Sequence, residues 1–382
     1  MAQADHARVR WRITFGTRAR GLLLCSLLCS LLLASCSEPQ PAAMGTELSV
    51  YSFAEYVPAE VLQNFEQETG VKVTLATYAN NEELLAELAT HPAQYDVVIP
   101  SDYAVEILIN GDALQPLDLT KIPHYNNIES SFLSPYFDPG GVSTSRRPAA
   151  RNQKFTLPYL WGTTGIAYDT TKVSNPITSW ADLWRPELAG HLVVLDDARE
   201  MVGLSLLTLG YDKNSTNAEQ IAAAGEKLKQ LVPGVIAFDS AKPEQYLLSG
   251  DAWAGVVFNG NAALAYQANP NIRYVFPQEG AGIWFDNLAI PAGAPHSEAA
   301  YAFINYLLAK EQGALILAEF PYSSPNHAAI EYLKESKPDL YQAYIDSPIN
   351  NPSQDVVSAA KLNKNLNSEA SALYEQTWAA LR

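Results

Sequence analysis

The sequence predicts an α/β protein built from two lobes. From Leu48 onward, short apolar runs alternate with amphipathic segments, which is the pattern of strands that alternate with helices. This series occurs twice, before and after a polar stretch at 138–154. The length of 382 residues also exceeds what one hydrophobic core usually organises, and favours two units of about 150 residues each.

The first series resembles an open, mostly parallel sheet. Pro58 and Gly70 bound one helical pattern, and Asn80 is a good N-cap for the next. The predicted strands are 48–53, 71–78 and 95–100, and the predicted helices are 58–70, 80–90 and 103–112. Ligands of such sheets gather at the carboxyl ends of the strands. The candidate site residues at those ends are Phe53, Glu55, Tyr56, Ser101, Asp102 and Tyr103. Helix capping is an alternative role for Ser101 and Asp102.

The second series repeats the alternation. Its expected strands and helices lie within 159–169, 191–210, 217–232, 235–239, 252–261 and 282–291. A long amphipathic helical region follows at 297–319. The stretch 138–154 has glycine, proline and four basic residues with little apolar content, so we expect a surface loop there.

Asp286 is a candidate ligand-binding acid. It lies in "GIWFDNLAIP", a predicted buried strand with no lysine or arginine within ten residues. An ionised carboxylate in such a place is costly unless something pairs with it. Either the partner is a bound cation, or the acid accepts hydrogen bonds from backbone amides near Asn287.

A second group of acids lies in "LDDARE". Asp197 and Glu200 are spaced i, i+3, so both fall on one side of a helix's first turn, with Asp196 beside them. The alternative is structural, because acids favour helix N-termini and Arg199 could neutralise one of them.

Aromatic residues accompany these acids. They are Phe53, Tyr56, Tyr103, Phe258, Trp284 and Tyr322. Each aromatic face attracts an alkylammonium group by roughly 0.5–2 kcal/mol and also covers methylene groups. Carboxylates with aromatics between them are complementary to a chain of amines and methylenes, so the pattern predicts a polyamine ligand.

The N-terminus predicts export. Five arginines precede an apolar run at 21–33 that is too short to span a bilayer comfortably. The run ends in Leu33-Ala34-Ser35-Cys36, which looks like the lipobox of bacterial lipoproteins, so we expect a lipid on Cys36; a plain signal peptide is the alternative. Removal of 1–35 takes away five arginines and Asp5, which changes the formal net charge from −16 to −20. This acidity argues against nucleic acid as a partner.

From about Leu48 to the C-terminus, the chain resembles the spermidine/putrescine-binding proteins of bacterial ABC importers. The segments that carry the resemblance are "EYVPAEVLQNFEQETGVKV", "YDVVIPSDYAVE", "LPYLWGTTGIAYD", "TSWADLWRPELAGHLVVLDDARE", "NLAIP" and "PYSSPN". The resemblance implies a two-lobed periplasmic-binding-protein fold of type II-like architecture, with a mostly parallel sheet in each lobe and a ligand cleft between the lobes. The expected division is a signal peptide at 1–35, a flexible tether at 36–46, one lobe from 47–160 with 287–322, and the other from 161–286 with 323–382.

The resemblance also implies the pocket. The ligand-binding positions would be Phe53, Tyr56, Ser101, Tyr103, Asp197, Glu200, Ser240, Phe258, Trp284, Asp286 and Tyr322. Glu55 and Asp102 are added as candidates because they follow the carboxyl ends of predicted strands. Phe53 and Phe258 stand where relatives commonly have tryptophan, a stronger cation–π surface. Asp102 stands where relatives have an uncharged residue. Near the C-terminus, Lys364 aligns close to a ligand-binding glutamine of the family, and a lysine there would repel a cation.

The expected function is therefore extracytoplasmic capture of a putrescine- or spermidine-type cation and its delivery to an ABC permease, by a lipid-anchored monomer without cofactor or metal. One alternative is a receptor of the same fold with another ligand or a sensing role. The six histidines are scattered, which disfavours a zinc carrier. An enzyme is disfavoured because the chain has no G-x-S-x-G, no H-E-x-x-H and no glycine-rich phosphate loop.

Overall fold

The structure is a computed structural model that describes residues 45–138 and 153–382. The predicted signal peptide, Cys36, nearly all of the tether and most of the expected loop at 138–154 lie outside the described residues. Within the described ranges, none of the helices combines the length and the apolar character needed to cross a membrane.

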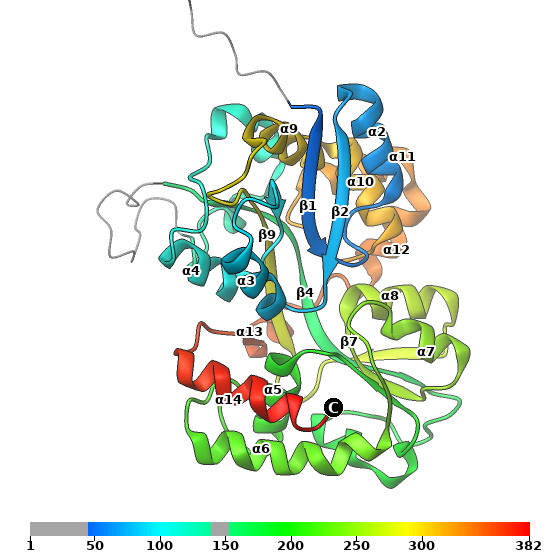
Figure 1. The fold of residues 1–382 in the computed structure, drawn as a ribbon. Coiled ribbons are helices and arrows are strands. Elements are labelled where there is room, and N and C mark those ends of the chain that lie inside the picture. Colours follow the sequence, from blue (N-terminus) through cyan, green and yellow to red (C-terminus); the bar gives the residue numbers. More distant parts are fainter. Residues whose placement is uncertain (1–44, 139–152) are drawn as a thin grey trace, which may run out of the picture. The chain divides into compact units, whose positions relative to one another are not determined.

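The strands of the described residues form one hydrogen-bonded sheet (Figure 1). In order across the sheet they are β2 (Lys72–Tyr78), β1 (Glu47–Phe53), β3 (Val97–Val98), β9 (Gly282–Ala289), β4 (Thr156–Asp169), β7 (Ala254–Phe258), β5 (Leu192–Val194) and β6 (Val235–Phe238). Two short strands pair at the side, β8 (Ile272–Val275) with β4 and β10 (Lys361–Leu362) with β9. The pairs β1–β2, β1–β3, β5–β6 and β5–β7 are parallel, whereas β4 and β9 pair antiparallel with each other.

The predicted helices of the first series form at the expected places. They are α2 (Ala59–Thr69), α3 (Asn81–Thr90) and α4 (Asp102–Asn110). Asn80 caps α3, because its side chain accepts a hydrogen bond from the Glu83 amide, and Gly70 ends α2 with a left-handed φ of 73°. The expected single helical region at 297–319 is two helices, α9 (Ser297–Leu307) and α10 (Lys310–Glu319).

The other helices follow the second series and the C-terminal region. They are α5 (Ala198–Thr208), α6 (Ala218–Leu231), α7 (Pro243–Ser249), α8 (Asn259–Ala268), α11 (His327–Ser336), α12 (Pro338–Asp346), α13 (Gln354–Ala359) and α14 (Ser368–Ala379). Short 3-10 turns lie at Leu119–Lys121, Pro123–Asn127, Ser130–Phe132, Trp180–Trp184, Pro186–Leu188 and Val232–Gly234.

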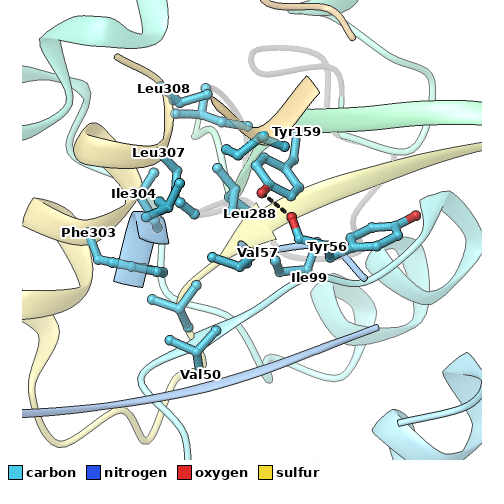
Figure 2. Close-up of a cluster of buried hydrophobic side chains, with 14 of the residues drawn as sticks. Val50, Tyr56, Val57, Ile99, Tyr159, Leu288, Phe303, Ile304, Leu307 and Leu308 are labelled. Atoms are coloured by element: carbon cyan, nitrogen blue, oxygen red, sulfur yellow. Dashed lines mark hydrogen bonds between the residues drawn. The ribbon is translucent and has the colours of Figure 1, made fainter. Parts of the chain in front are cut away.

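Two large hydrophobic cores lie along the sheet. The first contains Val50 of β1, Leu288 of β9 and Phe303 of α9 (Figure 2), and the second contains Met201 of α5 and Leu228 of α6. Strand β4 contributes to both, since Leu157 and Leu160 pack in the first core and Ile166 packs in the second. The result is a two-lobed α/β fold in which β4 and β9 pair with each other and β4 continues into the second lobe.

The C-terminal region divides between the cores at a different place from the expected boundary at residue 323. Tyr344 of α12 packs in the first core, and α11 packs against α10 and α12. Tyr374 and Trp378 of α14 pack in the second core. Residues 323–346 therefore belong with the first lobe, because the apolar faces of α11 and α12 are buried there.

Candidate ligand-binding site

A cavity lies where the ends of β1, β3, β5 and β7 meet β9. It is lined by Phe53, Ala54, Tyr56, Asn81, Ser101, Asp102, Tyr103, Asp197, Glu200, Ser240, Phe258, Trp284, Asp286, Tyr322 and Asn363. Both lobes contribute, with Ser101 from the β3–α4 junction and Asp197 from the β5–α5 junction. Every residue predicted to bind ligand lines this cavity except Glu55.

Strand alternation decides which side chains of β9 face the cavity. Trp284 and Asp286 line it, whereas Phe285 and Asn287 line a separate apolar cavity on the opposite face together with Trp161 of β4. Successive side chains of a strand point to opposite faces, so a shift of one residue would remove both Trp284 and Asp286 from the site.

Asp286 is held by two hydroxyl groups. Its side chain accepts hydrogen bonds from Ser101 Oγ, at 2.5 Å, and from the Tyr56 hydroxyl. Asn81 fixes Ser101 in turn, because its amide nitrogen donates to Ser101 Oγ at 2.9 Å and its oxygen accepts from the Ser101 backbone amide at 3.0 Å. The carbonyl of Tyr56 accepts a hydrogen bond from the Tyr159 hydroxyl at 2.7 Å, which Figure 2 shows beside the first core.

The partner of Asp286 is neither a cation nor a backbone amide. Its side chain is 1% exposed, and no ion pair to it is formed by any residue that the structure describes. Burial raises the pKa of the Asp286 carboxyl to about 7, although the hydrogen bonds from Ser101 and Tyr56 act in the opposite direction. The site thus contains a buried acid whose charge is not compensated within the described protein.

Asp102, the first residue of α4, is a second buried acid in the cavity. Its Oδ1 accepts a hydrogen bond from the Tyr103 backbone amide at 2.7 Å, while Oδ2 has no partner among the described residues. Burial raises the pKa of this carboxyl well above its usual range, and the nearby Asp286 adds to the effect. Asp102 therefore lines the cavity, while the N-cap of α4 is Ser101, whose side chain makes no capping hydrogen bond.

Asp197 and Glu200 occupy the first turn of α5 as their spacing predicts. Asp197 is the N-cap, and its Oδ1 accepts from the Glu200 amide at 2.9 Å. Glu200 Oε1 is 2.9 Å from Lys213 Nζ and 2.7 Å from Asn363 Nδ2. The cation beside Glu200 is thus Lys213 and not Arg199, which instead lies over the Tyr103 ring at 4.8 Å.

The two acids of this turn have opposite pKa shifts. Burial raises the pKa of Asp197, and the charges of Glu82 and Glu200 add to it. Burial alone would also raise the pKa of Glu200, but the Lys213 ammonium and the hydrogen bonds from Lys213 and Asn363 outweigh it and lower the pKa. Glu200 is therefore ionised and internally paired.

Aromatic rings surround the acids. Trp284 meets Phe258 edge to face with 5.7 Å between ring centroids, and meets Tyr322 at 5.8 Å. Tyr322 in turn lies 5.1 Å from Tyr56, which lies 5.4 Å from Phe53. Gly260 permits this packing, because a Cβ there would come within 2.4 Å of the Tyr322 ring.

Two positions stand apart from the cavity lining. Glu55 is not among the lining residues: its backbone is left-handed with a φ of 56°, and its carboxylate lies 3.5 Å from Lys242 Nζ and 3.2 Å from Asn261 Nδ2. It therefore links the first lobe to α7 and α8 of the second, and its role in ligand binding stays a prediction. Lys364 is exposed and does not line the cavity, whereas the neighbouring Asn363 does.

Sequence reasoning missed three side chains that line the cavity or contact its lining: Asn81, Lys213 and Asn363. Asn81 follows the helix cap Asn80, and the capping role of Asn80 was enough to account for asparagine in this segment, so Asn81 was not singled out. Lys213 lies in the turn between α5 and α6, and Asn363 follows β10, where no motif marks either residue. Only the tertiary contacts with Glu200 bring these two residues to the site. Within the described ranges, no cluster of His, Cys, Asp and Glu could hold a metal ion.

This fold and site define a class of protein. Two α/β lobes with a buried cavity lined by a few convergent polar groups and aromatic rings form a receptor for a small molecule. Residues 60–346 match the family of bacterial extracellular solute-binding proteins, and the chain belongs to this family. Its members bind solutes and are not enzymes.

Relatives with specific names share most of the chain. The spermidine/putrescine-binding periplasmic protein of Escherichia coli K12 is 38% identical over 75% of this chain and 79% of its own. The protein of the same name from Salmonella typhimurium is 35% identical over 88% of this chain and 91% of its own. Among solved structures, the TpPotD lipoprotein of Treponema pallidum superposes with a TM-score of 0.71 at 27% identity, covering 88% of this chain and 99% of its own.

Proposed function

We propose that this protein captures a linear polyamine in the cavity and delivers it to an ABC permease. Asp286 carries the proposal, because it is a buried carboxylate with hydroxyl partners only, and a ligand ammonium would complete its coordination. A desolvated, hydrogen-bonded charge pair of this kind is worth several kcal/mol, against about 1 kcal/mol or less for an exposed pair.

The rest of the cavity supports the same ligand class. Asp197, on α5 of the second lobe, is a second acid without an ion pair to a described residue, whereas Asp286 accepts hydrogen bonds from Ser101 and Tyr56 of the first lobe. The rings of Trp284, Phe258 and Tyr322 line the same cavity and offer faces for methylene groups and cations. Relatives at 35–38% identity are named for spermidine and putrescine, which agrees with this reading.

A thermal-shift screen tests the proposal. The domain from residue 45 onward would be heated with putrescine, cadaverine, spermidine, spermine, agmatine, amino acids and divalent metals. Only the polyamines should raise the melting temperature, by an amount that follows RT ln(1 + [L]/Kd). Stabilisation by amino acids or metals alone, with no response to any polyamine, would contradict the proposal and favour a receptor for another solute.

We further propose that the protein is held at the outer face of a bacterial membrane by a lipid on Cys36, as a monomer. The support is the Leu33-Ala34-Ser35-Cys36 sequence after an apolar run, and the TpPotD relative is itself named a lipoprotein. Cys36→Ala should move the full-length protein from the membrane fraction to the soluble fraction. Retention of the variant in the membrane fraction would point to another anchor.

A further inference from the structure

Lys213 is a buried cation at the edge of the ligand cavity. Its side chain is 3% exposed, and Nζ lies 2.9 Å from Glu200 Oε1, whose side chain is 6% exposed. Arg199 is the other buried cation of the described residues, and it faces the Tyr103 and Tyr374 rings. A lysine at this depth requires a permanent counter-charge, and Glu200 supplies it.

The surrounding fold holds Lys213 in place. A Cβ at Gly203 of α5 would come within 2.7 Å of Lys213 Cγ, so the absence of a side chain there makes room for the lysine stem. The carbonyl of Lys213 accepts a hydrogen bond from the Tyr374 hydroxyl of α14 at 2.8 Å. The ammonium is therefore fixed from two sides, by α5 along its stem and by α14 at its backbone.

The ion pair changes the charge that the cavity offers to a ligand. Glu200 and Lys213 cancel each other, and Asn363 Nδ2 occupies Glu200 Oε1 as well. Burial raises the pKa of Asp102 well above its usual range, whereas it raises the pKa of Asp197 to about 8 and that of Asp286 to about 7. Asp197 and Asp286 form no ion pair with a described residue, and we assign them to the ammonium groups of the ligand.

We infer that the Lys213 ammonium takes the place of a ligand ammonium at Glu200. Because this ion pair neutralises Glu200, the cavity favours ligands with two ammonium groups over ligands with three or more. This inference rests on the proposed polyamine function and narrows it to the α,ω-diamines. Lys213 affects specificity through Glu200: it neutralises this carboxylate and does not itself have to contact the ligand. Without it, Glu200 would be free to pair with a third ammonium.

Titration calorimetry of the wild type and of Lys213→Met, with putrescine, cadaverine, spermidine and spermine, tests the inference. The wild type should bind a diamine more tightly than spermidine, and Lys213→Met should shift the affinity ratio toward spermidine by about tenfold or more. General destabilisation would weaken both ligands and leave the ratio unchanged. Lys229→Met, at an exposed position on α6, is the matched control and should leave the ratio as it is.

A double variant keeps the test valid if Lys213→Met folds poorly. Glu200→Gln with Lys213→Met removes both charges and keeps an oxygen for the Asn363 amide. Its ratio of putrescine to spermidine affinity should stay within about threefold of the wild-type ratio, whatever its absolute affinity, because neither protein offers a third ammonium a free carboxylate at position 200. A double variant whose ratio shifts as far as that of Lys213→Met, an unchanged ratio in Lys213→Met, or a wild-type preference for spermidine would each overturn the inference. Failure of every amine to bind the wild type would overturn the proposed function itself.

Discussion

Two buried carboxylates of the cavity lining have opposite surroundings. Asp286 receives only neutral hydroxyl donors, and burial raises its pKa to about 7. Glu200 receives the Lys213 ammonium, and its pKa is lowered. Both side chains are almost fully buried. The difference teaches that burial alone does not mark an acid as a ligand site; the acid that lacks a protein cation is the one that a cationic ligand can complete.

The largest expected effect is on stability, at the pair of Glu200 and Lys213. Lys213→Met leaves Glu200 buried without its cation, and breaking a buried pair in this way costs about 3 kcal/mol of the free energy of unfolding. Urea unfolding of the ligand-free protein measures it. Lys229→Met, whose pair with Glu226 is exposed, should change stability little. If both variants lost the same free energy of unfolding, the Lys213 pair would be no stronger than a surface pair. The two carboxylates, Asp286 and Glu200, would then not differ in the way described.

The next effect is on ligand binding, at Asp286. Asp286→Asn keeps the size of the side chain but removes the charge, so affinity for polyamines should fall about tenfold or more while the fold stays intact. Calorimetry measures the affinity, and circular dichroism checks the fold. Asp251→Asn, at an exposed position in the second lobe, is the control. An unchanged affinity in Asp286→Asn would remove Asp286 from the site and with it the proposed function.

The smallest effect concerns pH. The pKa of Asp286 is raised to about 7 in the fold, against about 4 in an unfolded chain, so the folded state holds a proton between these values. Its contribution to stability therefore falls as pH rises from about 4 to about 7 and is constant above that. Ligand affinity runs the other way, because an ammonium needs the ionised carboxylate.

Affinity for putrescine should accordingly rise about tenfold or more from about pH 6 to about pH 8, with proton release on binding at the lower pH, because the pKa of Asp197, the second acid assigned to the ligand, is also raised, to about 8. Calorimetry in buffers of different ionisation enthalpy measures both quantities. Asp102 and the Tyr56 and Tyr78 hydroxyls also lie near Asp286, and burial raises the pKa of each. A flat affinity with no proton release would show that Asp286 is already ionised in the ligand-free protein.

The fold was largely predictable because its signals are local. Strand alternation, the Asn80 cap and the left-handed Gly70 each act within a few residues, and the structure contains those elements close to the expected bounds. The break between α9 and α10 and the return of α11 and α12 to the first lobe were not predicted, since long-range packing decides them.

The sequence by itself determined that Asp286 shares a strand face with Trp284 and that Asp197 and Glu200 share the first turn of a helix, because period-two alternation and the i, i+3 spacing fix which way side chains point. Only the tertiary structure decided which of these acids is already neutralised. Lys213 and Asn363 reach Glu200 from 13 and 163 positions away along the chain, and Glu55 turns from the cavity toward Lys242 and Asn261. Electrostatic pairing depends on distance in space, which sequence spacing does not give.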